Sequence, residues 1–77
     1  MPHVKLKLYA TLRQYAGGSP SVDLDIEPGT TIEQLLAQLG IPGGHARILF
    51  VNHRPARPTD SLDGGETVAA FPAVGGG

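Results

Sequence analysis

Two short segments with strictly alternating residues set the tightest limit on how this chain can fold. In residues 3–9 and again in residues 21–27, every second position is aliphatic and the positions between are polar or aromatic. A period of two is typical of a β-strand that buries one face. Both apolar faces need a cover, so the sequence predicts a sheet with one side turned into a hydrophobic core.

The polar faces of these two predicted strands carry opposite charges. Lys5 and Lys7 lie on the first strand, and Asp23 and Asp25 lie on the second. In an antiparallel pair, unlike charges placed across from each other contribute roughly 0.3 kcal/mol each. We therefore expect the two strands to pair antiparallel, with both lysines facing the aspartates.

Residues 30–39 carry the clearest helical pattern and supply the cover that the sheet needs. Their apolar residues recur at helical spacing in one stripe, made of Ile32, Leu35, Leu36 and Leu39. Thr30 and Glu33 have the spacing of a capping box, which would start the helix. Gly40 suits the left-handed position that ends a helix, and Pro42 prevents its continuation.

A shorter helix is predicted between the two alternating segments. Thr11 and Gln14 have capping-box spacing, Leu12 begins an apolar face, and Gly17 suits the helix end. Only about one and a half turns fit between these limits. Such a helix is marginal alone, so we expect packing to stabilise it.

The second half of the chain predicts two more strands. Residues 48–51 form a continuous apolar run that ends at a turn at residues 52–53, and residues 67–71 form the last strand. Pro55 and Pro58 restrict the segment that contains them to an edge strand or a loop.

This order of elements indicates the α+β class, a mixed sheet with one long helix packed across it and a short additional helix. If the last strand lies parallel beside the first, the result is a β-grasp (ubiquitin-like) fold. We assign residues 1–72 to this domain and residues 73–77 to a flexible C-terminal Gly-Gly tail.

Composition excludes several classes of function. Six Lys and Arg against seven Asp and Glu give a net charge of −1, so the chain lacks the basic surplus that nucleic-acid binding needs. It has no cysteine, which excludes a disulfide framework, a thiolate zinc site and a cysteine nucleophile. No apolar run is long enough for a signal peptide or a membrane span. At 77 residues we expect one soluble cytoplasmic domain that binds neither nucleic acid nor membrane.

Residues that could catalyse a reaction or hold a metal ion are few. His3, His45 and His53 show no metal-ligand spacing. The glycine pairs lie in predicted turns and lack the pattern of a phosphate-binding loop. We therefore predict no metal site, no bound cofactor and no catalytic site within the chain.

The end of the sequence is the feature most open to a functional interpretation. An apolar lead at residues 71–74 runs into Gly75, Gly76 and Gly77. One interpretation is a frayed end or a linker remnant. The other makes the terminal carboxylate the reactive group, because glycine has no Cβ and such a tail fits a narrow channel. Five extended residues reach about 16 Å, enough to deliver the carboxylate into the buried site of another protein.

Five stretches of the sequence together carry a resemblance to a known family. They are VKLKLYATLR at residues 4–13, GTTI at 29–32, VN at 51–52, DGGE at 63–66 and PAVGGG at 72–77. In these stretches the chain resembles the ubiquitin-like sulfur carriers of ThiS/MoaD type. The similarity covers the whole chain and is closest to the small subunits of molybdopterin synthase, which end in an apolar strand, a proline-containing lead and Gly-Gly.

The resemblance implies a carrier whose Gly77 carboxylate holds the cargo. An adenylating enzyme of the ubiquitin-activating type would use ATP to activate that carboxylate, and a sulfur donor protein would convert it to a thiocarboxylate. In the molybdopterin branch, the large synthase subunit would accept Gly76 and Gly77, and the sulfur would pass to a pterin precursor. The carrier itself would bind no cofactor and catalyse no step.

A partner-binding surface near the tail is also implied. Tyr9 faces away from the apolar side of the first strand, and Phe71 comes near it if the last strand lies beside the first. Exposed aromatic residues with a polar rim are typical of protein interfaces, and the family docks through this face of the sheet. We predict that Tyr9, Phe71, Pro72 and Val74 contact the partners.

Three other interpretations use the same residues. A sulfur carrier for thiamine, for tRNA thiolation or for cysteine synthesis would have the same tail chemistry. A ubiquitin-like modifier would join Gly77 to lysines of other proteins, whereas an interaction module would have an inert tail. The segment at residues 9–13 favours the molybdopterin branch, since thiamine carriers usually lack that short helix.

Overall fold

The two alternating segments form neighbouring strands, β1 (His3–Leu8) and β2 (Ser21–Asp25). The structure is a computed structural model and describes residues 2–41 and 46–72. The two strands pair antiparallel, which confirms the prediction made from their charges. Val4, Leu6 and Leu8 of β1 are buried in the core, and Val22 and Leu24 of β2 pack against it partly buried. Each set lies on one face of its strand, because successive side chains alternate between the two faces.

The register of this pair differs from the expected one at one lysine. Lys5 lies opposite Asp23, as predicted, but Lys7 lies opposite Ser21. The prediction that both lysines face aspartates was therefore wrong for Lys7. The segment that connects the strands contains a helix, and its length and packing set the alignment more strongly than exposed charge pairs do.

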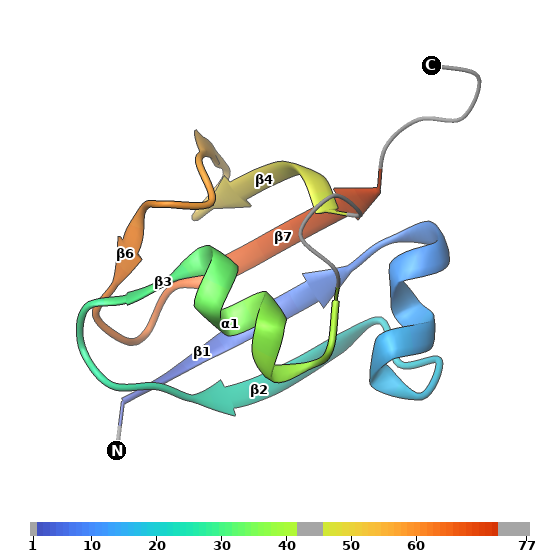
Figure 1. Ribbon diagram of the computed structural model, residues 1–77, viewed down its shortest axis with the longest axis horizontal. Helices are drawn as coiled ribbons and strands as arrows, with labels where there is room; N and C mark the ends of the chain where they lie inside the picture. Colours follow the sequence, from blue (N-terminus) through green and yellow to red (C-terminus); the bar gives the residue numbers. More distant parts are fainter. Residues whose placement is uncertain (1, 42–45, 73–77) are drawn as a thin grey trace.

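The sheet has five strands in the order β2-β1-β7-β4-β5 (Figure 1). The last strand, β7 (Thr67–Pro72), runs parallel to β1 and antiparallel to β4 (Ala46–Val51). This confirms the predicted parallel closure beside the first strand. At the far edge of the sheet lies β5 (Arg54–Ala56), which contains Pro55. This agrees with the prediction, because a proline has no N–H to donate and is tolerated in an edge strand.

The turn between β4 and β5 lies where the sequence predicted it. Asn52 and His53 both have positive φ, 50° and 69°, and Val51 pairs with Arg54 across the turn. Two central residues with positive φ are typical of the type I′ hairpin turn, which matches the twist of the flanking strands.

The helix that covers the sheet, α1 (Ile32–Gln38), begins one residue later than expected. Thr31 is its N-cap, and a capping box joins Thr31 and Gln34, so the predicted Thr30–Glu33 box was wrong. Thr30 is held in extended backbone by its strand pairing with Leu62, and its Oγ1 donates to the carbonyl of Glu27 at 2.6 Å. That pairing joins β3 (Thr30–Thr31) to β6 (Ser61–Leu62), a two-stranded sheet that the sequence analysis did not anticipate.

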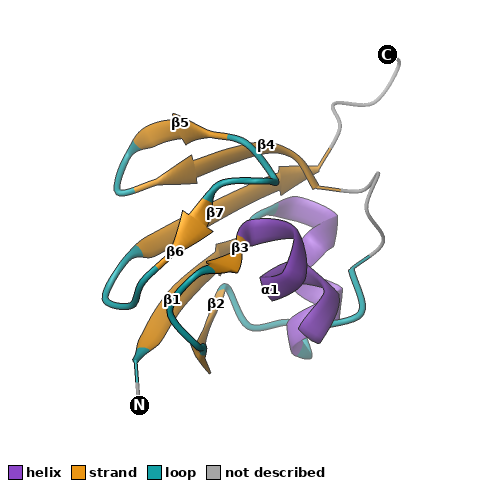
Figure 2. Ribbon diagram, turned by 60° about the vertical axis from the view of Figure 1, so that its left-hand side comes forward, coloured by secondary structure: helices purple, strands orange, loops and turns teal. Residues whose placement is uncertain are grey.

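The end of α1 is as predicted, since Gly40 has φ of 79° and follows the C-cap Leu39. Pro42 lies outside the described residues. Figures 1 and 2 show α1 lying across one face of the five-stranded sheet.

The short helix forms as a 3₁₀ helix, η1 (Ala10–Ala16), on the same side of the sheet as α1 (Figure 2). Its N-cap is Tyr9, in extended backbone and without a side-chain cap bond, so the predicted capping box at Thr11 was wrong. The helix starts at Ala10, which places Thr11 inside the first turn, where it cannot act as a cap. Gly17 ends the helix with φ of 64°, as predicted.

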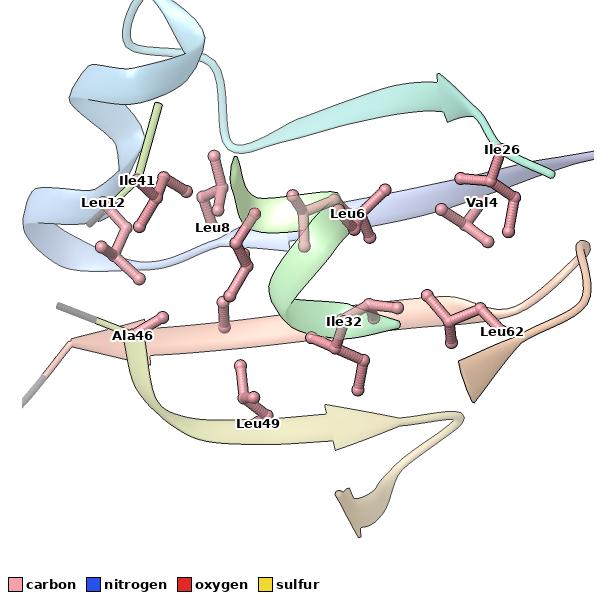
Figure 3. Packing of buried hydrophobic residues seen from close by; sticks show 14 residues of the cluster. Val4, Leu6, Leu8, Leu12, Ile26, Ile32, Ile41, Ala46, Leu49 and Leu62 are labelled. Atoms are coloured by element: carbon pink, nitrogen blue, oxygen red, sulfur yellow. The ribbon is translucent and has the colours of Figure 1, made fainter. Parts of the chain in front are cut away.

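Aliphatic side chains fill the space between the helices and the sheet (Figure 3). Every buried side chain in the described part of the chain belongs to this set: Val4, Leu6, Leu8, Leu12, Ile26, Ile32, Leu35, Leu36, Ile41, Ala46, Leu49, Leu62, Val68 and Ala70. Burying each large side chain contributes roughly 1.5–3 kcal/mol relative to its exposed state. Over residues 2–41 and 46–72, no helix has the length and hydrophobicity needed to cross a membrane.

Candidate functional site

The face of the sheet opposite α1 carries the side chains that alternate with the core positions of each strand. In β7, Val68 and Ala70 are buried in the core, so Ala69 and Phe71 point to the opposite face. We call this the outer face. It is defined by the half-buried and exposed residues of β1, β7 and β4 that do not contribute to the core.

Three aromatic rings gather on the outer face where β1 and β7 end. The rings of Tyr9 and Phe71 are stacked, with their centroids 4.2 Å apart and an interplanar angle of 11°. Phe50 meets Phe71 edge-on at 5.8 Å and 83°. Such pairs contribute about 0.5–1.5 kcal/mol each beyond the area that they bury. The predicted approach of Tyr9 to Phe71 is therefore present, with Phe71 at the centre of a three-ring aromatic cluster.

Phe50 is a member of this cluster that the sequence analysis did not single out. It lies in the continuous apolar run at residues 48–51, which has no alternation to show which side chains face the core. The structure places Leu49 in the core, and Ile48 and Phe50 on the outer face, where Ile48 keeps 43% of its surface exposed. A continuous apolar run of this length is compatible with burial on both faces of a sheet, so the sequence held no signal that separates Phe50 from the core positions.

The aromatic cluster borders a shallow hollow of about 240 Å³ on the outer face. Its lining consists of Lys7, Tyr9, Phe50, His53, Thr67, Ala69 and Phe71. The rings and Ala69 make the lining apolar, and Lys7, His53 and Thr67 supply polar atoms at its border. Aromatic side chains within a polar rim are typical of surfaces that bind other proteins.

Asn52 holds the β4–β5 turn against the start of β7 and so positions one border of the hollow. Its Oδ1 accepts a hydrogen bond from the backbone N–H of Thr67 at 3.0 Å, and its own N–H donates to the Thr67 carbonyl at 2.8 Å. His53 follows Asn52 in this turn, so these two bonds fix where His53 lies relative to β7.

The turn before β7 is fixed by the carboxylate of Glu66. Its two oxygens accept hydrogen bonds from the backbone N–H groups of Asp63, at 2.9 Å, and Gly64, at 2.7 Å. Partial burial raises the pKa of Glu66, but these backbone hydrogen bonds outweigh the burial and leave the pKa below its ordinary value. Gly64 has φ of 124°, and a Cβ at this position would lie 2.6 Å from Cβ of Pro2, so the close approach of the turn to the N-terminal segment requires glycine.

The predicted tail residues follow the aromatic cluster directly in the chain. Pro72 is half-buried and is the last residue of β7, next to Phe71. Val74, Gly75, Gly76 and Gly77 lie outside the described residues.

The described histidines and carboxylates do not converge. His3 and His53 are both exposed, and His45 lies outside the described residues. In residues 2–41 and 46–72, no three His, Asp or Glu side chains form a group that could hold a metal ion. The aromatic cluster and the hollow beside it are therefore the candidate site that the geometry supports.

Comparison of the sequence with protein families matches the ThiS family over residues 6–77. The match includes β1 from Leu6 onwards, both helices, β7 and the glycines at the end. No curated protein sequence matches the chain.

Solved structures with the same fold include a small archaeal modifier protein and molybdopterin-converting factor subunits. Small archaeal modifier protein 1 from Haloferax volcanii superposes with a TM-score of 0.75 at 23% identity, over 96% of this chain and 100% of that one. Molybdopterin converting factor, subunit 1, as assigned in Pyrococcus furiosus, gives 0.73 at 23% identity, over 96% and 100%. The complex of subunits 1 and 2 of molybdopterin-converting factor from Helicobacter pylori gives 0.62 at 15% identity, over 97% and 99%. At these identities the likeness shows the fold, and it confirms the predicted β-grasp class.

Proposed function

Because this chain belongs to the ThiS family, we propose that it carries sulfur as a thiocarboxylate on the C-terminal carboxyl group of Gly77. The observation that carries this proposal is the extent of the family match, which begins at Leu6 within β1, runs through β7 and includes Gly76 and Gly77. The aromatic cluster supports it, because it puts a surface suited to protein binding directly before the residues that would hold the cargo.

Loading takes two steps, and other proteins catalyse both. In the first, an oxygen of the Gly77 carboxylate attacks the α-phosphorus of ATP in a ubiquitin-activating-type enzyme, and pyrophosphate leaves. In the second, a sulfur donor protein delivers hydrosulfide to the carbonyl carbon, and AMP leaves with the bridging oxygen. The product is a thiocarboxylate. This chain contributes the carboxyl group and a glycine tail that lacks Cβ atoms and so fits a narrow channel.

In this proposal the outer face docks the chain on its partners while the tail enters their sites. Tyr9 and Phe71, stacked at 4.2 Å, form the anchor, and Pro72 and Val74 continue the contact towards the tail. Stacked aromatic residues bind well at interfaces because they are large and lose little conformational entropy on binding.

For the acceptor, we propose the large subunit of molybdopterin synthase, with transfer of the sulfur to a pterin precursor. Two observations favour this branch. The first is the helix η1 (Ala10–Ala16), which thiamine carriers usually lack. The second is the shared fold with subunit 1 of the Helicobacter pylori molybdopterin-converting factor, whose structure contains subunit 2 as a partner.

A second candidate function is protein modification through Gly77. It is favoured by the shared fold with small archaeal modifier protein 1 from Haloferax volcanii. Its chemistry starts from the same acyl-adenylate, but a lysine amine of another protein replaces the sulfur nucleophile.

The intact mass of the protein tests these alternatives. We would incubate it with ATP, a sulfur donor and extract from its host, with a variant that lacks Gly77 as control. A mass gain equal to the exchange of one oxygen for sulfur, absent in the variant, would support the carrier. High-mass conjugates without that gain would support the modifier. If neither product forms while the adenylating enzyme is active on its own substrate, the tail is inert and the proposal fails.

A further inference from the structure

We propose that the hollow beside the aromatic cluster binds an acidic protein surface, in which an apolar side chain of the adenylating partner enters the hollow and a partner carboxylate pairs with Lys7. This inference rests on the proposed function, because it describes how the same outer face selects its partner. It adds to the role of the aromatic cluster the prediction that the partner surface bound there is negatively charged.

The two lysines of β1 have different surroundings although they share a strand and a face. Lys5 lies directly opposite Asp23, whereas Lys7 lies directly opposite Ser21. Lys5 therefore has a carboxylate directly across from it in the sheet, whereas the aspartate nearest to Lys7 on β2 is the diagonal neighbour Asp23. On the other side, Lys7 lies beside Ala69 of β7, which brings it to the border of the aromatic cluster.

Lys7 is half-buried, while Lys5 is exposed. The methylene groups of a lysine can pack along an apolar surface while its ammonium group stays in water. Lys7 lines the hollow together with the three rings, so its side chain lies at the border of the aromatic cluster. No aspartate or glutamate lines the hollow with Lys7 in the described part of the chain, and a partner carboxylate would supply a countercharge there.

His53 adds an imidazole that can donate a hydrogen bond at the same hollow, from the β4–β5 turn that Asn52 fixes in place. None of the seven described residues that line the hollow is an aspartate or a glutamate. Lys7 therefore gives the described lining a positive charge, which contrasts with the net charge of −1 for the whole chain. A charge pattern that opposes the overall charge favours a complementary, acidic partner and suppresses others.

The size of the hollow favours a protein as the occupant. Its volume of about 240 Å³ lies below the roughly 300–1,000 Å³ of typical small-molecule sites. It is open to solvent and partly walled by the rings, and so it suits one or two protruding side chains. An apolar side chain against the rings and a carboxylate near Lys7 would use both parts of the lining.

A matched pair of charge reversals tests this proposal. Lys5→Glu and Lys7→Glu change the net charge by the same amount on the same face of the same strand. Their affinities for the purified ubiquitin-activating-type enzyme of the host would be measured by titration calorimetry at low and high salt. We expect Lys7→Glu to weaken binding by about tenfold or more and to remove most of its salt dependence, and Lys5→Glu to weaken it by less than about threefold.

A third variant, Lys7→Met, keeps a flexible stem of similar length and removes the charge. It should weaken binding at low salt and approach wild-type affinity at high salt, where pairing is screened. Urea unfolding of all three variants would confirm that each is folded under the binding conditions.

The outcomes separate the two proposals. If the wild-type chain binds and is adenylated but the two charge reversals weaken binding equally, or Lys7→Met binds like the wild type at low salt, the acidic-partner proposal is overturned and the carrier function stands. If the wild-type chain is neither bound nor adenylated by an enzyme that is otherwise active, both proposals are overturned.

Discussion

The two faces of the five-stranded sheet are built from the same strands but from different kinds of side chain. On the inner face, Val4, Leu6 and Leu8 of β1 are at most 1% exposed and pack under the helices. On the outer face of that strand, Lys5 is exposed and Lys7 is half-buried beside the aromatic cluster. Because successive side chains of a strand point to opposite faces, the six residues of β1 contribute to stability on the inner face and to recognition on the outer face.

The distribution of aromatic residues makes the difference between the faces sharper. The chain has two tyrosines and two phenylalanines, and Tyr9, Phe50 and Phe71 lie together on the outer face. The fourth, Tyr15, is partly buried against the core. Aromatic rings bury the largest areas and usually dominate cores. Here the buried residues of the described part are all aliphatic, so most of the rings are left available for contact with another protein.

The largest effect is expected on the inner face. Leu6→Ala removes a side chain with no exposed surface and should lower the free energy of unfolding by about 2–5 kcal/mol through lost burial and a residual cavity. Domains of this size rarely have more than about 3–5 kcal/mol in total, so the variant should be largely unfolded at room temperature. Urea unfolding followed by circular dichroism measures this change. Lys5→Ala, on the outer face of the same strand, is the control and should change stability by less than about 0.5 kcal/mol. Equal losses in both variants would contradict the division between the faces.

The next effect is expected on the outer face and should appear in binding. Phe71→Asp removes the ring that contacts both Tyr9 and Phe50, and affinity for the adenylating partner should fall by about 100-fold or more, as for a central interface residue. Unfolding should stay cooperative, with a loss of about 1–3 kcal/mol from the two ring contacts. Phe71→Leu, which keeps an apolar side chain, should retain most of the binding. A Phe71→Asp variant that does not fold would instead make Phe71 part of the core.

A smaller effect on stability is expected at the N-terminus of α1, the helix that covers the inner face of the sheet. Thr31→Ala removes both the Thr31 Oγ1 acceptor and the capping box with Gln34, and should cost about 1 kcal/mol of stability. Thr11→Ala is the matched control, because Thr11 makes no cap to η1, and should cost less than about 0.5 kcal/mol. Both values come from urea unfolding. If the two variants lose the same stability, the capping geometry of α1 has no energetic role.

The smallest effect is expected at the turn before β7, and it depends on pH. The hydrogen bonds to Glu66 hold its pKa below the ordinary value of 4.5 in the folded state. A carboxyl group whose pKa is lower in the folded than in the unfolded state stabilises the protein at pH values above its ordinary pKa. This contribution is lost as the pH falls through the folded-state pKa. Glu66→Gln should therefore be slightly less stable than the wild type at pH 7, with the difference shrinking below pH 4.5. Binding to the adenylating partner at pH 7 should not change. A difference in stability that grows as the pH falls would contradict this, because it would mean that folding raises the pKa of Glu66.

Where the structure agreed with the sequence, the reason is that the signal was local. Alternation in residues 3–9 and 21–27 identified two strands and their buried faces, and the stripe in residues 30–39 identified α1. Gly17 and Gly40 marked helix ends because positive φ strongly favours glycine. The placement of Tyr9 near Phe71 followed once β7 was set parallel to β1.

The sequence alone also supplies the chemistry of the proposed function, because the Gly-Gly end and its apolar lead are properties of the residues themselves. Only the tertiary structure decided which side chains meet. The alignment of β1 with β2 placed Ser21 rather than an aspartate opposite Lys7, the pairing of Thr30 with Leu62 shifted the cap of α1 by one residue, and β4 turned Phe50 towards Phe71. Each outcome depends on pairing between distant segments, whose free energy is shared over many weak contacts and leaves no periodicity in the sequence.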